Sequence, residues 1–192
     1  MTNILGISGS LRAGSFNTML LQQAASTAPE GTLIELGSIK GIPLYDGDVE
    51  SASGLPAAAQ KLKSQVTECD GLLLVTPEYN NGIPGVFKNA IDWLSRPASD
   101  VPRVFGNLPV AIIGASPGNF GTLLAQEAWL PVLRILGTRP WFGARLMVSR
   151  AGSVFNAAGD ITDEAVLAQL RKFMHGFAGF VETNRRQAGA RP

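Results

Sequence analysis

The chain has 192 residues, of which 45% are hydrophobic and 16% are charged, and its 16 basic residues nearly balance its 15 acidic ones. This length suits one domain with a real core, so we expect residues 1–192 to form a single domain. The balance lacks the basic excess of a nucleic-acid-binding protein and the polarity of a disordered chain. One cysteine and one histidine exclude internal disulfides, cysteine-cluster zinc sites and multi-histidine metal sites, so no metal is predicted.

The sequence gives no sign of membrane insertion. Its first residues have no basic segment leading into a long apolar stretch, and no later run approaches the ~18 apolar residues that span a bilayer. We therefore expect a cytoplasmic protein. Cys69 lacks a neighbouring Lys or Arg that would lower its pKa, so it is interpreted as a small packing residue.

Short apolar runs alternate with amphipathic stretches along the whole chain. The runs predict buried strands at residues 4–8, 33–36, 72–76, 110–114 and 146–149. The amphipathic stretches predict helices at residues 15–26, 56–67, 86–94, 122–136 and 163 to about 183. Thr162 is the expected N-cap of the last helix, and Pro131 is expected to kink its helix or start a new turn. The tail after about residue 185 has the composition of a frayed terminus.

Strict alternation of strands and helices requires right-handed crossovers and a parallel sheet covered on both faces. The predicted fold is therefore a three-layer α/β sandwich with a five-stranded parallel sheet, and we choose the flavodoxin-like strand order 2-1-3-4-5. In such sheets ligands bind beyond the carboxyl ends of the strands. Functional residues are expected just after Ser8, Thr76 and Gly114.

The segment after the first strand has the composition of a phosphate cradle. Hydroxyl, amide and guanidinium groups gather with two glycines where the chain turns into a helix, at Ser10, Arg12, Ser15, Phe16 and Asn17. Amides at a helix N-terminus favour an anion, and a terminal phosphate monoester fits this loop. The segment lacks both Gly-x-Gly-x-x-Gly and Gly-Lys-Ser/Thr, which argues against a dinucleotide pyrophosphate and a nucleoside triphosphate. An ordinary polar loop with Ser15 as the N-cap is the alternative.

The third strand ends in a loop rich in proline and glycine, at residues 77–85. Backbone groups of such a loop can face the polar edge of a planar heterocycle while Tyr79 packs beside it. A rigid surface turn with Tyr79 half buried is the alternative reading.

The fourth strand leads into residues 114–118, which match the Gly-x-Ser-x-Gly nucleophile elbow of hydrolases. Ser116, then Asp160 or Asp163, then His175 would even reproduce the chain order of a catalytic triad. However, the oxyanion hole needs a backbone N–H from the residue after the nucleophile, and Pro117 has none. His175 is also expected to lie half buried inside the last helix, so a serine hydrolase is a weak alternative.

Taken together, these loops resemble the NAD(P)H-dependent FMN reductase family of flavodoxin-like proteins, which includes quinone, azo-dye and chromate reductases. The resemblance spans nearly the whole chain. It is carried by residues 6–12 with Ser15 and Asn17, residues 77–80 with Pro84-Gly85, residues 88–93 with Ser95-Arg96, and residues 116–118. The chain departs from the family pattern at Asn107-Leu108-Pro109, where Gly-Lys-Pro is common, and this departure removes a positive charge before the fourth strand.

The resemblance implies roles for individual positions. It implies an FMN phosphate loop at Ser10, Arg12, Ser15, Phe16 and Asn17, an isoalloxazine loop at Pro77, Glu78, Tyr79, Asn80 and Gly82, and a wall beside the flavin ring at Ser116 and Gly118. It also places residues 41–46 at the partner subunit's active site.

The resemblance implies an FMN-dependent enzyme that passes a hydride from NADPH or NADH through bound FMN to a quinone, flavin, azo or similar acceptor, by a ping-pong mechanism. No catalytic side chain is predicted, because the flavin does the chemistry. A non-catalytic flavodoxin-type electron carrier is the alternative, although the net charge of +1 differs from the acidic surface usual in that class.

We also expect a homodimer or homotetramer, because a flavin above the strand ends of a small domain keeps one face exposed. The expected contacts are apolar residues that a lone domain would present to water, namely Ile42, Pro43, Leu44, Tyr45, Trp93 and Leu94.

Overall fold

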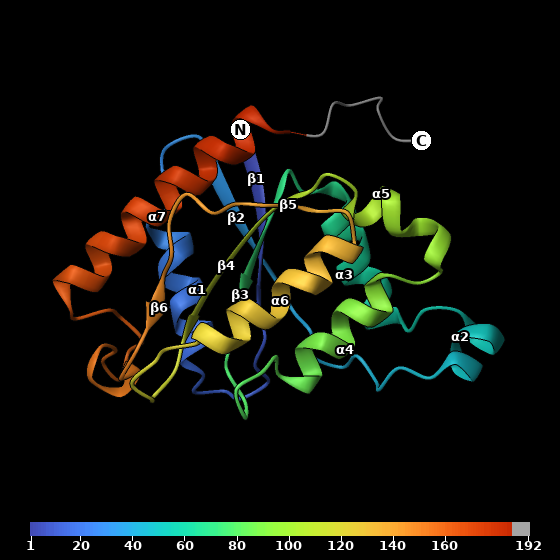
Figure 1. The fold of residues 1–192 in the computed structure, drawn as a ribbon, viewed down its shortest axis with the longest axis horizontal. Helices are drawn as coiled ribbons and strands as arrows, with labels where there is room; N and C mark the ends of the chain where they lie inside the picture. The colour runs from blue at the N-terminus through green and yellow to red at the C-terminus, as the bar shows by residue number, and fades with distance from the viewer. Residues whose placement is uncertain (186–192) are drawn as a thin grey trace.

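The computed structural model describes residues 1–185 and contains one parallel sheet between two layers of helices (Figure 1). The strands are β1 (Thr2–Ser8), β2 (Thr32–Gly37), β3 (Gly71–Val75), β4 (Pro109–Ala115), β5 (Arg139–Pro140) and β6 (Met147–Val148). Their order is β2-β1-β3-β4-β5, with β6 also paired to β4. The predicted flavodoxin-like order is confirmed. The predicted frayed tail lies outside the described residues.

The fifth position of the sheet differs from the prediction because two short strands share it. β5 pairs with the start of β4 at Pro109 and Val110, and β6 pairs with its end at Gly114 and Ala115. Between them the chain leaves the sheet after Trp141, whose ring centroid lies 4.9 Å from that of Phe173. The predicted strand at residues 146–149 corresponds to β6, whereas β5 was not predicted.

The sheet faces are covered by α1 (Phe16–Ser26) and α7 (Glu164–Thr183) on one side, and by α3 (Ala57–Glu68), α4 (Gly85–Leu94) and α6 (Leu123–Ile135) on the other (Figure 1). Shorter elements are α2 (Gly47–Ser53), α5 (Val101–Phe105) and the 3-10 turns η1 (Ala98–Asp100) and η2 (Ala151–Ser153). Each side of the sheet has its own apolar core. The alternation predicted from the sequence therefore produces both layers.

One local expectation about helix geometry was wrong. The N-cap of α7 is Asp163 rather than Thr162, because Asp163 Oδ1 accepts hydrogen bonds from the amides of Ala165 and Val166 at 2.9 and 3.1 Å. α6 runs through Pro131 as one helix, and the kink expected at this residue stays a prediction. Packing of Trp129 and Leu133, both buried in the core, holds that helix together across the proline.

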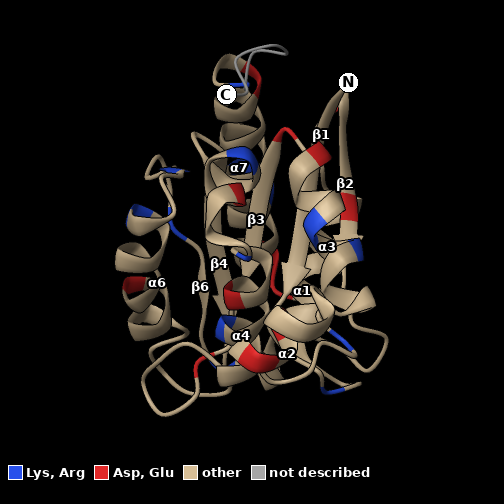
Figure 2. Ribbon diagram, turned by 90° about the vertical axis from the view of Figure 1, so that its right-hand side faces the viewer, with Lys and Arg blue, Asp and Glu red and all other residues tan. Residues whose placement is uncertain are grey.

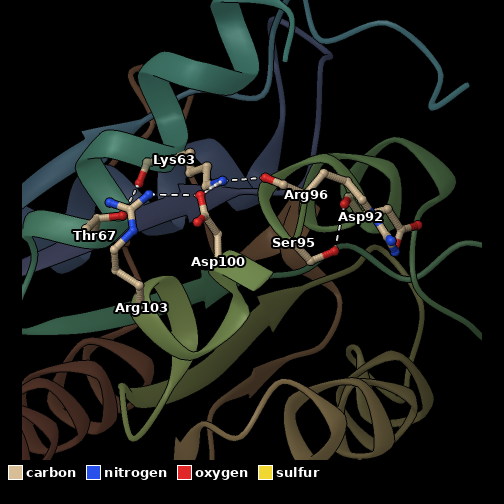
Figure 3. Close-up of polar contacts among 7 residues, drawn as sticks. All are labelled: Lys63, Thr67, Asp92, Ser95, Arg96, Asp100 and Arg103. Atoms are coloured by element: carbon tan, nitrogen blue, oxygen red, sulfur yellow. Dashed lines mark hydrogen bonds and ion pairs between the residues drawn. The ribbon is translucent and has the colours of Figure 1, made fainter. Parts of the chain in front are cut away.

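Lys63 on α3 is a buried cation that fastens this helix to the loop after α4 (Figure 3). Its ammonium donates to Asp100 Oδ2 at 2.6 Å and to the carbonyl oxygen of Arg96. Arg103 donates to the same carboxylate oxygen at 2.9 Å. The hydrogen bond from Lys63, and then the one from Arg103, holds the pKa of Asp100 below its ordinary value. The carboxylate thus neutralises a charge that water does not reach.

Asp100→Asn should lower the free energy of unfolding by ~2–4 kcal/mol, because it leaves the Lys63 ammonium buried beside a neutral amide. Asp92→Asn is the matched control, since it removes an exposed pair with Lys88 and should cost less than about 0.5 kcal/mol. Urea titrations at pH 7 measure both. Because the folded pKa is lowered, the contribution of Asp100 is present at neutral pH and is lost as the pH falls through that value. Equal costs for the two variants would contradict this account.

Candidate functional site

Three loops meet at the carboxyl edge of the sheet, because β1, β3 and β4 occupy consecutive positions in it. We call them the β1 loop (residues 9–15), the β3 loop (residues 76–84) and the β4 loop (residues 116–122). Backbone hydrogen bonds join them where the strands end, from Gly9 N to Val75 O at 2.9 Å and from Thr76 N to Ile113 O at 2.8 Å. The three places singled out in the sequence therefore form one continuous surface.

The β1 loop presents backbone donors at the N-terminus of α1. Within the described chain no hydrogen bond is made by the amides of Ser10, Leu11, Ala13, Gly14 and Phe16. Ser15 is the N-cap, and its Oγ accepts from the amides of Asn17 and Thr18 at 3.2 and 3.4 Å. The exposed guanidinium of Arg12 lies over the Phe16 ring, with Cζ 5.6 Å from the ring centroid. Five open amides and one guanidinium at a helix N-terminus fit a phosphate group.

Asn17 turns its side chain inward, away from the open amides. Its Nδ2 donates to the carbonyl of Ala115 at 2.8 Å, and its Oδ1 accepts from the Ala115 amide at 2.9 Å. Asn17 is only 3% exposed, so both bonds are buried. The side chain therefore fixes the start of α1 against the end of β4.

The β3 loop contains a tight two-residue turn. Tyr79 and Gly82 exchange two backbone hydrogen bonds of 3.1 Å, and Asn80 and Asn81 between them have φ angles of 51° and 61°. Two left-handed central residues define a type I′ turn, for which asparagine is well suited. The turn holds Tyr79 half exposed at the surface.

Glu78 fastens the β3 loop to α6. Its Oε2 accepts a hydrogen bond from the Ala125 amide, at 2.9 Å, in the first turn of that helix. Thr122, the N-cap residue, makes no side-chain capping bond, so the carboxylate of Glu78 takes this role and complements the helix dipole.

The β4 loop excludes the hydrolase alternative. Ser116 Oγ donates to the carbonyl oxygen of Gly121 at 2.6 Å, and Gly118 O accepts from the Arg150 amide at 2.9 Å. His175 lies on α7 beside Met1 and Gly31, at the amino end of the sheet and not near Ser116. The expectation that His175 is half buried was wrong, because α7 presents it to solvent.

The segment after β2 is attached to α4, which corrects the expectation that Trp93 and Leu94 face water. Both are fully buried within the chain. Trp93 Nε1 donates to the carbonyl of Pro43 at 2.9 Å, and its ring lies 5.0 Å from that of Tyr45. The hydrogen bond with Glu50 raises the pKa of the Tyr45 hydroxyl. Leu44, in contrast, is 81% exposed.

Sequence reasoning missed the buried support beneath these loops. Thr76 has no exposed surface; its Oγ1 donates to the carbonyl of Pro77 at 2.8 Å and accepts from Trp129 Nε1 at 3.1 Å. A side chain at Gly114 would overlap Thr122 and the carbonyl oxygen of Thr76. Thr76 and Trp129 are 53 positions apart, so no local pattern could reveal their contact.

The described part of the chain shows neither a membrane-spanning helix nor a metal-binding cluster. Among residues 1–185, none of the helices combines the length and hydropathy that a bilayer crossing requires. The same residues contain no group of three or more His, Cys, Asp or Glu side chains that could hold a metal ion.

Comparison with known proteins identifies the family. Residues 2–153 match the family described as NADPH-dependent FMN reductase. The chain belongs to this family. It is 46% identical to an NAD(P)H-dependent FMN reductase of Pseudomonas aeruginosa over 84% of this chain and 85% of that protein. It is 40% identical to a 2-hydroxy-1,4-benzoquinone reductase of a Burkholderia species over 92% and 94% of the two chains.

A solved structure agrees with these matches. The flavoenzyme FerB of Paracoccus denitrificans, an NAD(P)H:(acceptor) oxidoreductase, superposes with a TM-score of 0.87 at 30% identity, covering 97% of this chain and all of that one. Family membership makes this chain a flavin-dependent oxidoreductase with FMN as its cofactor and NAD(P)H as its electron donor. The choice between an enzyme and a non-catalytic electron carrier is thereby decided for the enzyme.

Asn17→Ala should lower the free energy of unfolding by ~2–4 kcal/mol, because it leaves the buried amide and carbonyl of Ala115 without partners. Asn89→Ala is a close control. Asn89 also makes one donor and one acceptor bond to backbone, with Pro43 and Tyr45 at 2.8 Å each, but both are exposed to water. Its loss should cost no more than about 1 kcal/mol. Urea unfolding of both apoproteins measures the difference, and equal losses would show that burial of the Asn17 bonds contributes nothing.

Proposed function

We propose that this chain, as a single FMN-binding domain, reduces quinone-type acceptors with NAD(P)H in two separate half-reactions. NAD(P)⁺ leaves before the acceptor binds, in the same place beside the flavin. One observation carries the proposal. The β1 loop, with its open amides, and the β3 loop, with its tight turn, lie side by side at the carboxyl edge of the sheet. The names of the reductases from Pseudomonas and Burkholderia support it.

The residues divide into those that bind and those that position. Ser10, Arg12, Ser15 and Phe16 bind the FMN phosphate through amides, a hydroxyl and the guanidinium, while Asn17 holds their loop in place. The isoalloxazine ring is bordered by the β3 loop at Pro77, Glu78, Tyr79, Asn80 and Gly82, and by Ser116 and Gly118 of the β4 loop.

FMN, when bound, supplies the chemistry, accepting a hydride from the nicotinamide and returning two electrons to the acceptor. The chain's own contribution is to orient the rings and limit access of water. None of these residues is proposed as a general acid or base, because the flavin itself would supply the redox chemistry. NAD(P)H is a cytoplasmic reductant, which fits the expected location of the protein.

The tests of this function are the cofactor released by heat and the turnover of purified protein. Chromatography should identify FMN rather than FAD, and NAD(P)H oxidation should accelerate on addition of a quinone. Initial rates at several fixed quinone concentrations should give parallel double-reciprocal lines, as two separate half-reactions require. Intersecting lines would contradict the two-step order, and absence of turnover would contradict the proposed function itself.

A second copy of the chain is proposed to cover the open face of the flavin. An apolar stripe runs along α6 at Leu124, Ala128, Pro131 and Ile135, and Ile135 is 81% exposed. The only charged residues of α6 are Glu127 and Arg134, and the helix carries few charges in Figure 2. The stripe begins beside Ala125, whose amide is bound by Glu78 of the β3 loop. A dimer formed through it would therefore place one subunit next to the flavin site of the other.

Arg12→Ala should weaken FMN binding by ~1.5–3 kcal/mol, through loss of a charge-assisted hydrogen bond to the phosphate. Arg171→Ala, which removes an exposed guanidinium from α7, should leave FMN affinity unchanged. Flavin fluorescence titration of the apoproteins measures both. Unchanged affinity in Arg12→Ala would remove Arg12 from the site.

Leu124→Glu should dissociate the dimer and lower turnover together, because it places a charge in the apolar stripe beside the β3 loop. Leu33→Glu is the control, since Leu33 is equally exposed but lies on β2 at the opposite edge of the sheet. Analytical ultracentrifugation should give a multiple of the chain mass of 20.2 kDa for wild type and Leu33→Glu. A monomeric wild-type enzyme with full activity would refute the shared site.

A further inference from the structure

A second polar hollow lies on the other side of the β1 loop, between α1 and the end of β2. We call it the β2 groove; it has a volume of about 240 Å³. Its polar wall includes Ser10, Arg12, Gln22, Ser38 and Lys40. The proposed flavin ring contacts, in the β3 and β4 loops, are absent from this wall. The groove therefore shares Ser10 and Arg12 with the proposed phosphate loop but none of the residues proposed to border the flavin ring.

The charge of the β2 groove is positive and uncompensated. Among the described residues that line it, two are cationic and none is Asp or Glu. Within the described chain the Lys40 ammonium makes neither an ion pair nor a hydrogen bond. The carboxylate of Glu35 on β2 is bound to Gln65 at 2.5 Å and does not line the groove. An anion in the groove would therefore meet no negative side chain that repels it.

Hydroxyl groups add directed donors to this charge. Ser10 Oγ accepts the amide of Arg12 at 3.3 Å, and Ser38 Oγ accepts the amide of Lys40 at 3.2 Å. Each serine thereby holds a short turn with its lone pairs and keeps its O–H proton available to a ligand. Lys40 and Ser38, which lie outside the β1 loop, supply a cation and a hydroxyl donor suited to the oxygens of a phosphate monoester, and Ser10 and Arg12 border them.

The sheet order sets what can reach this groove. β1 lies between β2 and β3 in the sheet, so the β1 loop lies between the groove and the β3 loop. Neighbouring strands are ~5 Å apart, which puts the end of β2 ~10 Å from the end of β3. An extended dinucleotide with its nicotinamide over the flavin spans more than this distance. An adenosine end directed over the β1 loop toward β2 is therefore long enough to reach the groove. NADPH carries a phosphate monoester on that end, whereas NADH carries a hydroxyl.

We propose that the β2 groove binds the 2′-phosphate of NADPH, with Lys40 as the residue that makes the enzyme prefer NADPH to NADH. This inference rests on the proposed function only in placing the nicotinamide over the β3 loop. Arg12 lies between the groove and the proposed FMN phosphate site, so Lys40 is the cationic residue that lines the groove alone.

Lys40→Gln should raise the KM for NADPH about tenfold, the effect of one charge-assisted hydrogen bond, while the KM for NADH changes less than twofold. Lys172→Gln removes an equally exposed lysine from α7 and should change neither constant. Equal increases for the two dinucleotides in Lys40→Gln would overturn the proposal. A loss of FMN affinity in that variant would also overturn it, because the groove would then belong to the flavin phosphate.

A binding measurement keeps this test independent of turnover. Calorimetry on the holoprotein should show 2′,5′-ADP binding about tenfold more tightly than 5′-AMP, and the difference should vanish in Lys40→Gln. Inorganic phosphate should bind more weakly than 2′,5′-ADP; equal affinity would mean a phosphate site without a nucleotide partner and would overturn the proposal. If quinone reduction fails with both dinucleotides while 2′,5′-ADP still binds through Lys40, the proposed function is wrong and the groove assignment stands.

Discussion

The buried pair of hydrogen bonds between Asn17 and the backbone of Ala115 is the constraint on which the site depends. β1 and β4 are not neighbours in the sheet, because β3 lies between them. Their loops would otherwise be related only through the sheet, and each could move with its own helix. By satisfying both backbone groups of Ala115, Asn17 sets the N-terminus of α1 at a fixed place relative to the β4 loop. The open amides of the β1 loop and the β4 loop are thereby parts of one rigid unit.

The sequence predicted the sheet well because its strands are buried on both faces and form short apolar runs. The fifth position was harder, since the chain leaves the sheet only after Trp141, whose amide still bonds to Val110 while its ring packs against Phe173, a contact that no local pattern encodes. The N-cap of α7 was misplaced by one residue because Thr162 and Asp163 are both good capping residues. Composition identified the loops, whereas the contacts beneath them depend on tertiary structure.

Trp93 illustrates why the exposure of a side chain is hard to predict from local sequence. Its position at the end of an amphipathic helix indicated a subunit contact. In the structure, the segment after β2 folds over α4 and the Pro43 carbonyl satisfies the indole N–H. A residue's exposure depends on segments far away in the chain, and Trp93 is 50 positions from this partner. The surface that does face water, the stripe on α6, shows only once the core-facing side of that helix is known.

The left-handed pair Asn80 and Asn81 bears on when the β3 loop becomes ordered. Their turn is closed by two backbone hydrogen bonds between Tyr79 and Gly82. These bonds are local, and asparagine tolerates the left-handed conformation, so the loop takes its order from its own backbone. The conformational entropy of the turn is therefore lost when the protein folds. Any molecule that binds against this loop would meet a preorganised surface, which favours affinity because less entropy is left to be lost on association.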